Sequence, residues 1–396
     1  MIDGIPVNFF LDAARFAILI FCLLAFAALH IPIRAIIDNT PPVIDLWYGD
    51  QQVFGQNGIP QRWINILGTV TDPETGVARL TYRLNDGETI SVLLGPDKRR
   101  LAHPGDFNIE IAISDLKIGS NSLVLEAYNR IGLSTITEVT VDYYQQPRSL
   151  PYSIRWAEVE NPLDVVQVVD GKWTCDANGI RTARPGYDRL LAIGDMTWTD
   201  YEVTVPLTIH GVNTGGYGTK ESGGAGLGVN FHWQGHTDDP VKCNCDGEPR
   251  QPHCGWRPKG GSNWYSFKRF KPRKPRSDYL TIDVDPSPEP RGSTRTSAIE
   301  FQFGHTYIFR ARVETTADGL LYRLKVWEPA VEQEPAEWTL SRIGIPGDEI
   351  KGVLQNGSIT LVAHQVDVTF GDIDIIPLND QAELLDDKVN FSVVSD

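Results

Sequence analysis

Histidine and cysteine side chains gather in one stretch of the sequence, between Phe231 and Arg276. Six of them fall within 23 residues: His232, His236, Cys243, Cys245, His253 and Cys254. Imidazole nitrogens and thiolates are the usual zinc ligands, so this stretch is a candidate for a structural metal site. Its CxC followed by one later Cys differs from the paired CxxC…CxxC spacing of a zinc ribbon. A metal site is therefore the weaker interpretation.

Disulfides are the favoured interpretation of the same cysteines. Four cysteines lie beyond the hydrophobic N-terminal segment: Cys175, Cys243, Cys245 and Cys254. An even number suits two disulfides in an oxidising compartment, and free thiols are the remaining alternative. A bond between Cys243 and Cys245 would be geometrically poor, so two of the three pairings stay open.

A basic and aromatic run overlaps this stretch, in a chain whose formal net charge is −15. We predict that it binds a partner or a glycan through Trp233, Trp256, Arg257, Lys259, Trp264, Tyr265, Lys268, Arg269, Lys271, Arg273, Lys274 and Arg276. Cations interleaved with aromatic faces could hold an acidic polysaccharide, anionic lipid headgroups, single-stranded nucleic acid or an acidic protein patch. The net charge disfavours nucleic acid, because phosphate would be repelled. The alternative is a solvated loop that neutralises the protein's own acidic surface.

Catalytic motifs are missing from the sequence. Glycan hydrolysis normally needs two carboxylates that converge on the scissile bond. Asp283 alternates with Asp285, and Asp372 with Asp374, but edge acids such as the second pair usually face solvent. No Gly-x-Ser-x-Gly elbow, P-loop or dinucleotide fingerprint occurs. We therefore expect no catalytic residue and no cofactor, and a glycan-active hydrolase or lyase is the least favoured function.

Short strands joined by tight turns must position these side chains. The 396 residues include 36 Gly, 26 Pro, 10 Trp and 13 Tyr, which favours an all-β fold over a helical bundle. Leu80, Tyr82 and Leu84 alternate before Asn85-Asp86-Gly87, a strong hairpin signal. About seven such strands lie between Val43 and Tyr144, as expected for a two-sheet sandwich.

Turn and strand-end motifs recur in this first β region. They are Gly68…Asp72…Gly76, Pro104-Gly105-Asp106-Phe107 and Leu116…Gly119…Asn121…Leu125…Ala127…Asn129…Gly132. In these motifs the chain resembles the immunoglobulin-like domains of bacterial surface proteins. The resemblance implies an immunoglobulin-like sandwich that serves as a spacer or interaction module. It implies little chemistry, because the matching residues shape turns.

A larger β region follows, from about Tyr152 to Leu378. Its motifs are Asp170-Gly171-Lys172-Trp173, Thr199-Asp200-Tyr201-Glu202-Val203 and Val368-Thr369-Phe370-Gly371-Asp372-Ile373. In these motifs the chain is similar to concanavalin A-like (laminin G-like) jelly rolls, including the 3-keto-disaccharide hydrolase-like and lectin branches. The resemblance implies a jelly-roll fold, and its lectin-like branch implies sugar binding through surface aromatics. Fold alone does not decide function.

The N-terminal segment Phe16–Ile33 contains no formal charge. Eighteen residues at 1.5 Å each span about 27 Å, close to the bilayer core of about 30 Å. We favour a retained transmembrane anchor, because Asp3 and Asp12 make a poor n-region for a signal peptide. A cleaved signal peptide, ending near Ala25-Phe26-Ala27, and a buried core helix are the alternatives.

The expected organisation combines these segments. It comprises residues 1–37 with a transmembrane helix at about 16–33, a linker at 38–42, an immunoglobulin-like β-sandwich at 43–145, a linker at 146–151, a concanavalin A-like jelly roll at 152–378 with an inserted Cys/basic loop at 231–276, and an acidic tail at 379–396. We expect a single-pass protein of the cell membrane whose bulk is extracytoplasmic, in the periplasm or at the cell surface.

The expected function is non-catalytic binding. The stiff linker at 38–42 would hold the first domain close to the bilayer, which suits a scaffold or accessory subunit that docks on a membrane protein complex. Its partners would then be the membrane itself and other membrane or extracytoplasmic proteins. A lectin-like surface protein that binds carbohydrate, with polysaccharide as its ligand, is the alternative.

Overall fold

The computed structural model describes residues 39–97, 99–216, 224–237, 251–256, 260–272, 274–285, 287–288, 295–347 and 353–378. These residues form an all-β structure whose helical elements are three-residue 3-10 turns. Within the same ranges, no helix is long and apolar enough to cross a membrane. The predicted anchor at 16–33 and the acidic tail at 379–396 lie outside the described residues.

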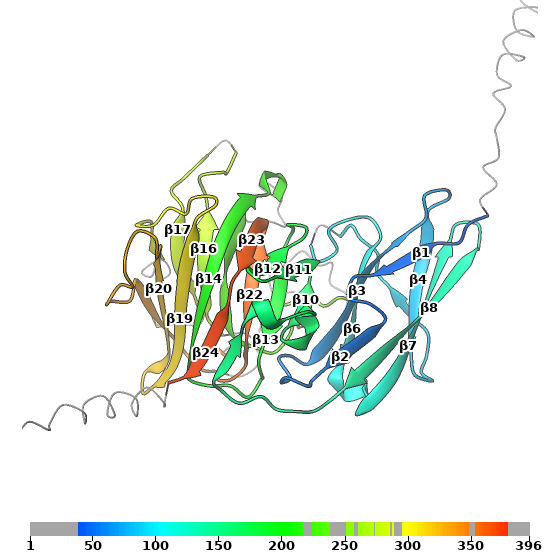
Figure 1. Cartoon of the computed structure of the whole chain (residues 1–396), viewed down its shortest axis with the longest axis horizontal. Coiled ribbons are helices and arrows are strands. Elements are labelled where there is room, and N and C mark those ends of the chain that lie inside the picture. The colour runs from blue at the N-terminus through cyan, green and yellow to red at the C-terminus, as the bar shows by residue number, and fades with distance from the viewer. Residues whose placement is uncertain are drawn as a thin grey trace, which may run out of the picture. The chain divides into compact units, whose positions relative to one another are not determined.

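A first β-sandwich occupies the N-terminal part of the described chain (Figure 1). Its strands are β1 (Val43–Leu46), β2 (Gln51–Phe54), β3 (Trp63–Thr71), β4 (Val77–Leu84), β5 (Ile90–Val92), β6 (Asp106–Ala112), β7 (Gly119–Asn129) and β8 (Ser134–Tyr143). One sheet has the order β1-β3-β6 and the other the order β2-β8-β7-β4-β5. β2 pairs with β8 in parallel, whereas the remaining pairs are antiparallel.

The core of this sandwich follows the alternation of its strands. Leu80 and Tyr82 of β4 are buried between the sheets, together with Ile109 of β6. The predicted hairpin is confirmed, since β4 pairs antiparallel with β5 and Asn85 takes a positive φ of 50° in the turn between them. Asn tolerates this left-handed conformation better than most residues, which explains the turn signal in the sequence.

A second, larger sandwich follows. Its strands are β9 (Tyr152–Ile154), β10 (Gln167–Asp170), β11 (Trp173–Asp176), β12 (Gly179–Thr182), β13 (Arg189–Ile193), β14 (Tyr201–Val212), β15 (Ala225–Trp233), β16 (Ser262–Phe267), β17 (Tyr279–Asp283), β18 (Arg295–Thr296), β19 (Thr306–Thr316), β20 (Gly319–Trp327), β21 (Leu340–Gly344), β22 (Ser358–His364), β23 (Val366–Phe370) and β24 (Ile373–Pro377). A seven-stranded sheet has the order β10-β13-β22-β15-β16-β17-β18. A nine-stranded sheet has the order β11-β12-β23-β14-β19-β20-β21, with β24 and β9 joined through β14.

The two large sheets face each other across one hydrophobic core. Leu227, Val229 and Phe231 of β15 enter it from the seven-stranded sheet, and Val205 and Leu207 of β14 enter it from the nine-stranded sheet. Because side chains alternate along a strand, every second residue of the seven-stranded sheet points away from this core. We call that side the outward face.

Two β-bulges change which residues reach the outward face. In β10 the register shifts between Val168 and Asp170, and in β15 it shifts between Asn230 and Trp233. His232, inside the second bulge, has a positive φ of 51°. A bulge inserts one residue and so redirects the side chains that follow it. As a result Asp170 and Trp233 lie on the outward side instead of in the core.

Candidate functional site

The outward face has a covered half, at β10 and β13, and an open half, at β15 to β18. In the covered half a small apolar cluster is buried: Val169, Leu190, Ala192, Trp233 and Val362. Trp256 and Trp264 pack against its edge. The Nε1 atom of Trp233 donates a 2.9 Å hydrogen bond to the side-chain oxygen of Gln61, from the first sandwich. Trp233 therefore joins the two sandwiches.

An ionic cluster lies beside this apolar cluster and is formed by Arg100, Glu110, Asp170, His236 and His253. The guanidinium of Arg100 is 2.7 Å from Asp170 Oδ1 and 2.7 Å from Glu110 Oε1. The side chain of Arg100 is 2% exposed, and both carboxylates are 0% exposed. His253 Nδ1 lies 2.6 Å from Glu110 Oε2, and His236 Nε2 lies 3.3 Å from Asp170 Oδ2. Each charge thus has a partner inside the protein.

The residues of the ionic cluster come from both sandwiches. Glu110 is on β6, on the side opposite to the core residues Ile109 and Ile111, and therefore faces the second sandwich. Asp170 is brought to it by the bulge in β10. Asn108, two residues before Glu110, donates hydrogen bonds to Val169 O at 2.8 Å and to Asp170 Oδ1 at 3.0 Å. The cluster fixes one sandwich to the other.

Electrostatics keep the Glu110 carboxylate of the cluster ionised. Burial by itself would raise the pKa of Glu110. The positive charge of Arg100 and the hydrogen bond from His253 outweigh burial and lower the pKa of Glu110 to about 2. A charged Glu110 is thus built into the junction at neutral pH.

In the weaker hypothesis of a metal site, the three histidines have other partners, and Cys243 and Cys245 lie outside the described residues. His236 and His253 pair with Asp170 and Glu110 in the ionic cluster. His232 instead donates a 2.6 Å hydrogen bond from Nδ1 to Leu354 O, and burial lowers its pKa to about 4. No group of three His, Cys, Asp or Glu side chains suited to a metal occurs in the described ranges.

The disulfide prediction is wrong for one cysteine. Cys175, half-buried on β11, is a free thiol, so it does not form one of the two predicted disulfides. Cys254 is buried and disulfide-bonded. Cys243 and Cys245 lie outside the described residues. Pattern counting overestimated the pairing because an even number of cysteines does not require all of them to pair.

The open half contains a pocket of about 390 Å³. This volume is within the range of about 300–1,000 Å³ found for small-molecule sites. The pocket is lined by Asp188, Asn230, Trp256, Ser262, Trp264, Ser266, Tyr279, Thr281, Ile282, Asp283, Arg295, Arg342 and Val362. Three aromatic rings therefore share one pocket with amide, hydroxyl, carboxylate and guanidinium groups.

Trp264 forms an aromatic platform in this pocket, packed closely on β15. A Cβ atom placed on Gly226 of β15 would lie 2.3 Å from Trp264 Cζ2 and 2.5 Å from Nε1. The indole ring therefore lies directly on the backbone of β15, where only a glycine leaves room for it. Trp264 Nε1 donates a 3.1 Å hydrogen bond to Ser266 Oγ, which fixes the orientation of the ring. The half-buried ring lines the pocket.

Asp188 provides a fixed acceptor at the edge of the pocket. His364 Nδ1 lies 2.6 Å from Asp188 Oδ1 and donates to it. Burial would raise the pKa of Asp188, but the charge of His364 and its hydrogen bond outweigh burial and lower that pKa. An ionised carboxylate accepts hydrogen bonds and cannot donate a proton. Asp188 therefore suits ligand hydroxyl groups better than acid catalysis.

At the opposite edge of the pocket, two cationic side chains lie by the ring of Tyr279. The Cζ atom of Arg295, on β18, lies 4.1 Å from the centre of the Tyr279 ring. The Nζ atom of Lys268 lies 5.7 Å from the same centre. Both distances are within the range of a cation–π interaction. The edge formed by β17 and β18 is thus basic and aromatic.

The aromatic residues predicted to bind, together with Lys268, divide into two groups. Trp256 and Trp264 line the pocket, and Lys268 lies beside it. Trp233 and Tyr265 are each 0% exposed, so their inclusion in a binding surface is corrected. The bulge in β15 turns Trp233 to the covered half of the outward face, where it is buried. Tyr265 alternates into the core, where it stacks on Phe301 with ring centres 3.9 Å apart.

The basic residues of the predicted run also differ from one another. Arg269 pairs with Asp278 at 3.1 Å and with Glu300 at 3.0 Å, so it supports the loop. The exposed members are Lys271, Lys274 and Arg276. Arg257, Lys259 and Arg273 lie outside the described residues.

Sequence reasoning missed most of the pocket. It did not select Asn230, Asp188, Tyr279, Arg295 or Arg342. One signal was present: polar and aromatic residues alternate as Ser262-x-Trp264-x-Ser266 and as Tyr279-x-Thr281-x-Asp283. Such alternation places each set on one face of a strand. Which two strands lie side by side could not be deduced from it.

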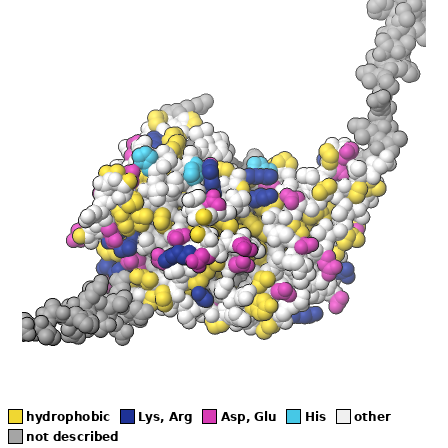
Figure 2. Space-filling view, viewed as in Figure 1, with side chains coloured by type: hydrophobic (Ala, Val, Ile, Leu, Met, Phe, Trp, Pro, Cys, Tyr) yellow, Lys and Arg dark blue, Asp and Glu magenta, His cyan; other side chains and the backbone are white. Residues whose placement is uncertain are grey.

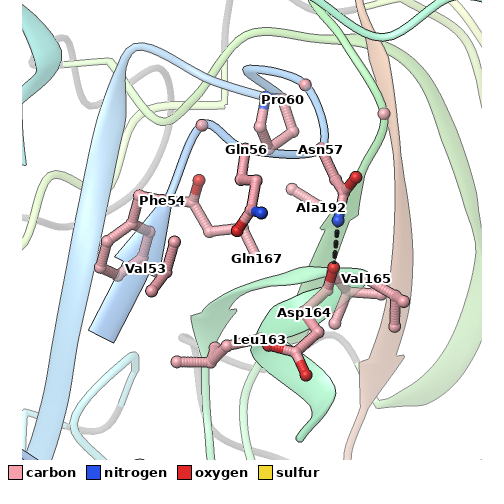
Figure 3. A pocket seen from close by; sticks show the side chains of 14 residues that line it. Val53, Phe54, Gln56, Asn57, Pro60, Leu163, Asp164, Val165, Gln167 and Ala192 are labelled. Atoms are coloured by element: carbon pink, nitrogen blue, oxygen red, sulfur yellow. Dashed lines mark hydrogen bonds between the residues drawn. The ribbon is translucent and has the colours of Figure 1, made fainter. Parts of the chain in front are cut away.

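A second hollow lies between the two sandwiches and is shown in Figure 3. Its volume is about 40 Å³, which suits a few water molecules and not a ligand. Asn57 Nδ2 donates a 2.6 Å hydrogen bond across it to Asp164 O. This hollow is a part of the junction.

Comparisons with known proteins give distant similarities. No protein-family model matches the sequence, and a search of curated proteins finds no significant match. Among solved structures, the chain is similar to the Ca²⁺-bound exoplasmic/lumenal domain of VIP36, at 12% identity over 57% of this chain and 90% of that one, with a TM-score of 0.35.

Two further structures are similar at the same level. One is a protein of unknown function with a galectin-like fold from Bacillus subtilis, at 11% identity over 58% of this chain and 96% of that one, with a TM-score of 0.32. The other is lectin II from Ulex europaeus, at 7% identity over 58% and 99%, also with a TM-score of 0.32. Such low TM-scores do not establish what this chain binds.

Proposed function

We propose that this protein binds carbohydrate in the pocket on the outward face of the seven-stranded sheet. The observation that carries the proposal is the Trp264 ring, which packs on β15 at Gly226 and lines a pocket of polar side chains. Carbohydrate binding replaces docking on a membrane complex as the leading function.

The chemistry of the pocket suits a sugar ring. One face of a pyranose presents C–H groups, which pack well on an indole, while its rim presents hydroxyl groups that need donors and acceptors. Trp264 supplies the apolar platform. Asn230 supplies an amide, and the ionised Asp188 supplies an acceptor that His364 holds in place.

The described surface offers less support for docking on another protein. Large exposed apolar side chains occur on both sandwiches: Val43, Ile90, Leu93, Ile118, Ile131, Ile136, Tyr144, Phe303, Val331 and Ile345. On the face that Figure 2 presents, acidic and basic side chains are interspersed. Protein interfaces usually need one contiguous apolar patch.

The family and location hypotheses belong to the same proposal. The strand order β1-β3-β6 against β2-β8-β7-β4-β5 supports an immunoglobulin-like first sandwich, and the two large sheets support a concanavalin A-like jelly roll. An extracytoplasmic location with an anchor at 16–33 would place the pocket among cell-surface or periplasmic glycans. Protease digestion of intact cells and spheroplasts tests this location, and an intracellular chain would contradict it.

A glycan array followed by calorimetry tests the proposed function. The full-length chain in detergent should bind at least one glycan class, and Trp264→Ala should weaken that binding about tenfold or more, equivalent to ~1.4 kcal/mol. Trp338→Ala is the matched control. Trp338 is also a half-buried tryptophan, but it lies beside Arg312 and Lys325 of the nine-stranded sheet.

Two results would contradict the proposal. One is an array on which the wild-type chain binds no glycan. The other is an equal loss of affinity for Trp264→Ala and Trp338→Ala, because this would mean that the platform has no special role.

A further inference from the structure

We infer that the carbohydrate is acidic, and that its carboxylate or sulfate groups are held by Arg295 and Lys268 at the edge of the pocket formed by β17 and β18. This inference rests on the proposed function and adds the chemical class of the ligand. Two observations support it: one half of the outward face is covered by the first sandwich, and the edge of the other half is positively charged.

The covered half restricts the direction in which a bound chain can extend. Next to Trp256 the outward face is occupied by Trp233, Val169 and Leu190, which are buried under residues of the first sandwich. A glycan seated on Trp264 therefore cannot continue across β13 and β10. It must extend in the other direction, across β16 and β17 toward β18.

A pair of cations stands in that direction. Arg295 and Lys268 both lie by the ring of Tyr279, with 4.1 Å and 5.7 Å to its centre. Arg295 is exposed, and in the described ranges no ion pair joins it to a carboxylate. An arginine stacked on an aromatic ring keeps its N–H groups at the ring edge, where they can bind a carboxylate or a sulfate in a bidentate manner.

The positive charge continues beyond the pocket. The sequence from Lys268 to Arg276 contains six basic residues and no acidic one. Among them Lys271, Lys274 and Arg276 are exposed. The chain as a whole has a net charge of −15, so this segment is a local region of positive charge in an acidic protein. Such a region would attract a polyanion.

The acidic side chains of the pocket are compatible with this assignment. Asp188 accepts a hydrogen bond from His364, which offsets its charge, and it lines the pocket together with Asn230. Asp283 is exposed on β17 and also lines the pocket. Neutral hydroxyl groups fit beside these two carboxylates, and the anionic group fits beside the Tyr279 ring, where Arg295 and Lys268 lie.

Paired probes test the charge of the ligand with the full-length chain. One pair is an oligogalacturonate and its methyl ester, and the other is a sulfated galactan oligosaccharide and its desulfated form. We expect at least one acidic probe to bind about tenfold more tightly than its neutral partner. This preference should shrink as NaCl rises from ~0.05 to ~0.5 M, because salt screens exposed charges. The pair that shows the preference identifies carboxylate or sulfate as the group that is bound.

Substitutions at the edge locate the recognition. Arg295→Gln and Lys268→Gln should each weaken binding of the acidic probe about fivefold and leave binding of the neutral probe unchanged. Arg79→Gln is the matched control, since Arg79 is an exposed arginine 4.0 Å from the ring of Tyr128, in the first sandwich. It should change neither affinity.

The outcomes separate this inference from the proposed function. One outcome is that acidic and neutral probes bind with equal affinity while Trp264→Ala still abolishes the binding of both. In that case the proposed carbohydrate binding stands, and the inference that the ligand is acidic is wrong. If Arg295→Gln weakens both members of a pair equally, it acts by positioning Tyr279, and charge recognition is also wrong. If no probe or array glycan binds, the proposed function itself fails.

Discussion

The covered and open halves of one sheet face use the same residue types for opposite purposes. In the covered half, Asp170 contacts both His236 and Arg100, and all three residues are buried. In the open half, Asp188 contacts His364 at the edge of a pocket of about 390 Å³. The difference lies in what covers the strands, since residues of the first sandwich cover β10 but not the pocket on β15 to β18.

This difference shows how a polar cluster acquires or loses a binding role. A buried charge must have partners within the protein, because leaving it unpaired is costly, and those partners occupy the space that a ligand would need. Where the first sandwich is absent, the same sheet face keeps unfilled volume beside its polar groups. Substitutions in the covered half should therefore lower the free energy of unfolding. Substitutions in the open half should lower the affinity for the ligand.

The largest effect should come from the centre of the covered half. Arg100→Met removes the cation between Asp170 and Glu110 and leaves two buried carboxylates without it. We expect the free energy of unfolding to fall by roughly 3–5 kcal/mol, the usual loss when one partner of a buried ion pair is removed. Denaturant unfolding followed by tryptophan fluorescence measures this change.

An exposed ion pair is the matched control. Arg181 forms two 2.8 Å contacts with Asp367, and its side chain is 48% exposed. Arg181→Met should lower the free energy of unfolding by less than about 1 kcal/mol, because surface ion pairs contribute little. Equal losses for both substitutions would contradict the distinction between the two environments.

The second largest effect should come from acid, which lowers the contribution of the ionic cluster to the free energy of unfolding. The pKa of Glu110 is lowered to about 2 in the folded protein from its ordinary value near 4.5, so its contribution is complete above pH 4.5 and is lost as the pH falls toward 2. Between about pH 6 and about pH 3 this loss amounts to about 2 kcal/mol. Glu110→Gln should reduce the pH dependence of the free energy of unfolding by that amount. An unchanged pH dependence would show that Glu110 is not held ionised.

The smallest effect should be confined to the open half. Gly226→Ala places a methyl group where the Trp264 ring lies, 2.3 Å from its Cζ2 atom, so the platform must move. We expect about a tenfold loss of glycan affinity, equivalent to ~1.4 kcal/mol. Gly211→Ala on β14, which has no atom within 4 Å of the new Cβ, is the control and should bind normally.

A double substitution sharpens this test. If Gly226→Ala acts through the platform, it should add little to Trp264→Ala, since the affected contact is already gone. Fully additive losses would indicate that Gly226 supports the site in some other way.

Part of the site was within reach of the sequence. The aromatic and basic content of residues 256–276 pointed to Trp256, Trp264 and Lys268, which lie in or beside the pocket. The same reasoning wrongly included Trp233 and Tyr265, because residue type does not show which face of a strand is buried. In β15 a bulge changes the face on which Trp233 lies, and the residue pattern does not predict this bulge.

The sequence by itself determined the all-β class, the hairpin at Asn85-Asp86-Gly87 and the alternating strands, because these depend on local backbone preference and on a period of two. Only the tertiary structure decided that Asp170, Glu110 and Arg100 meet, or that Trp264 of β16 lies on Gly226 of β15. Those contacts join residues far apart in the chain. They depend on strand order and register, which the packing of whole sheets selects and which no local pattern encodes.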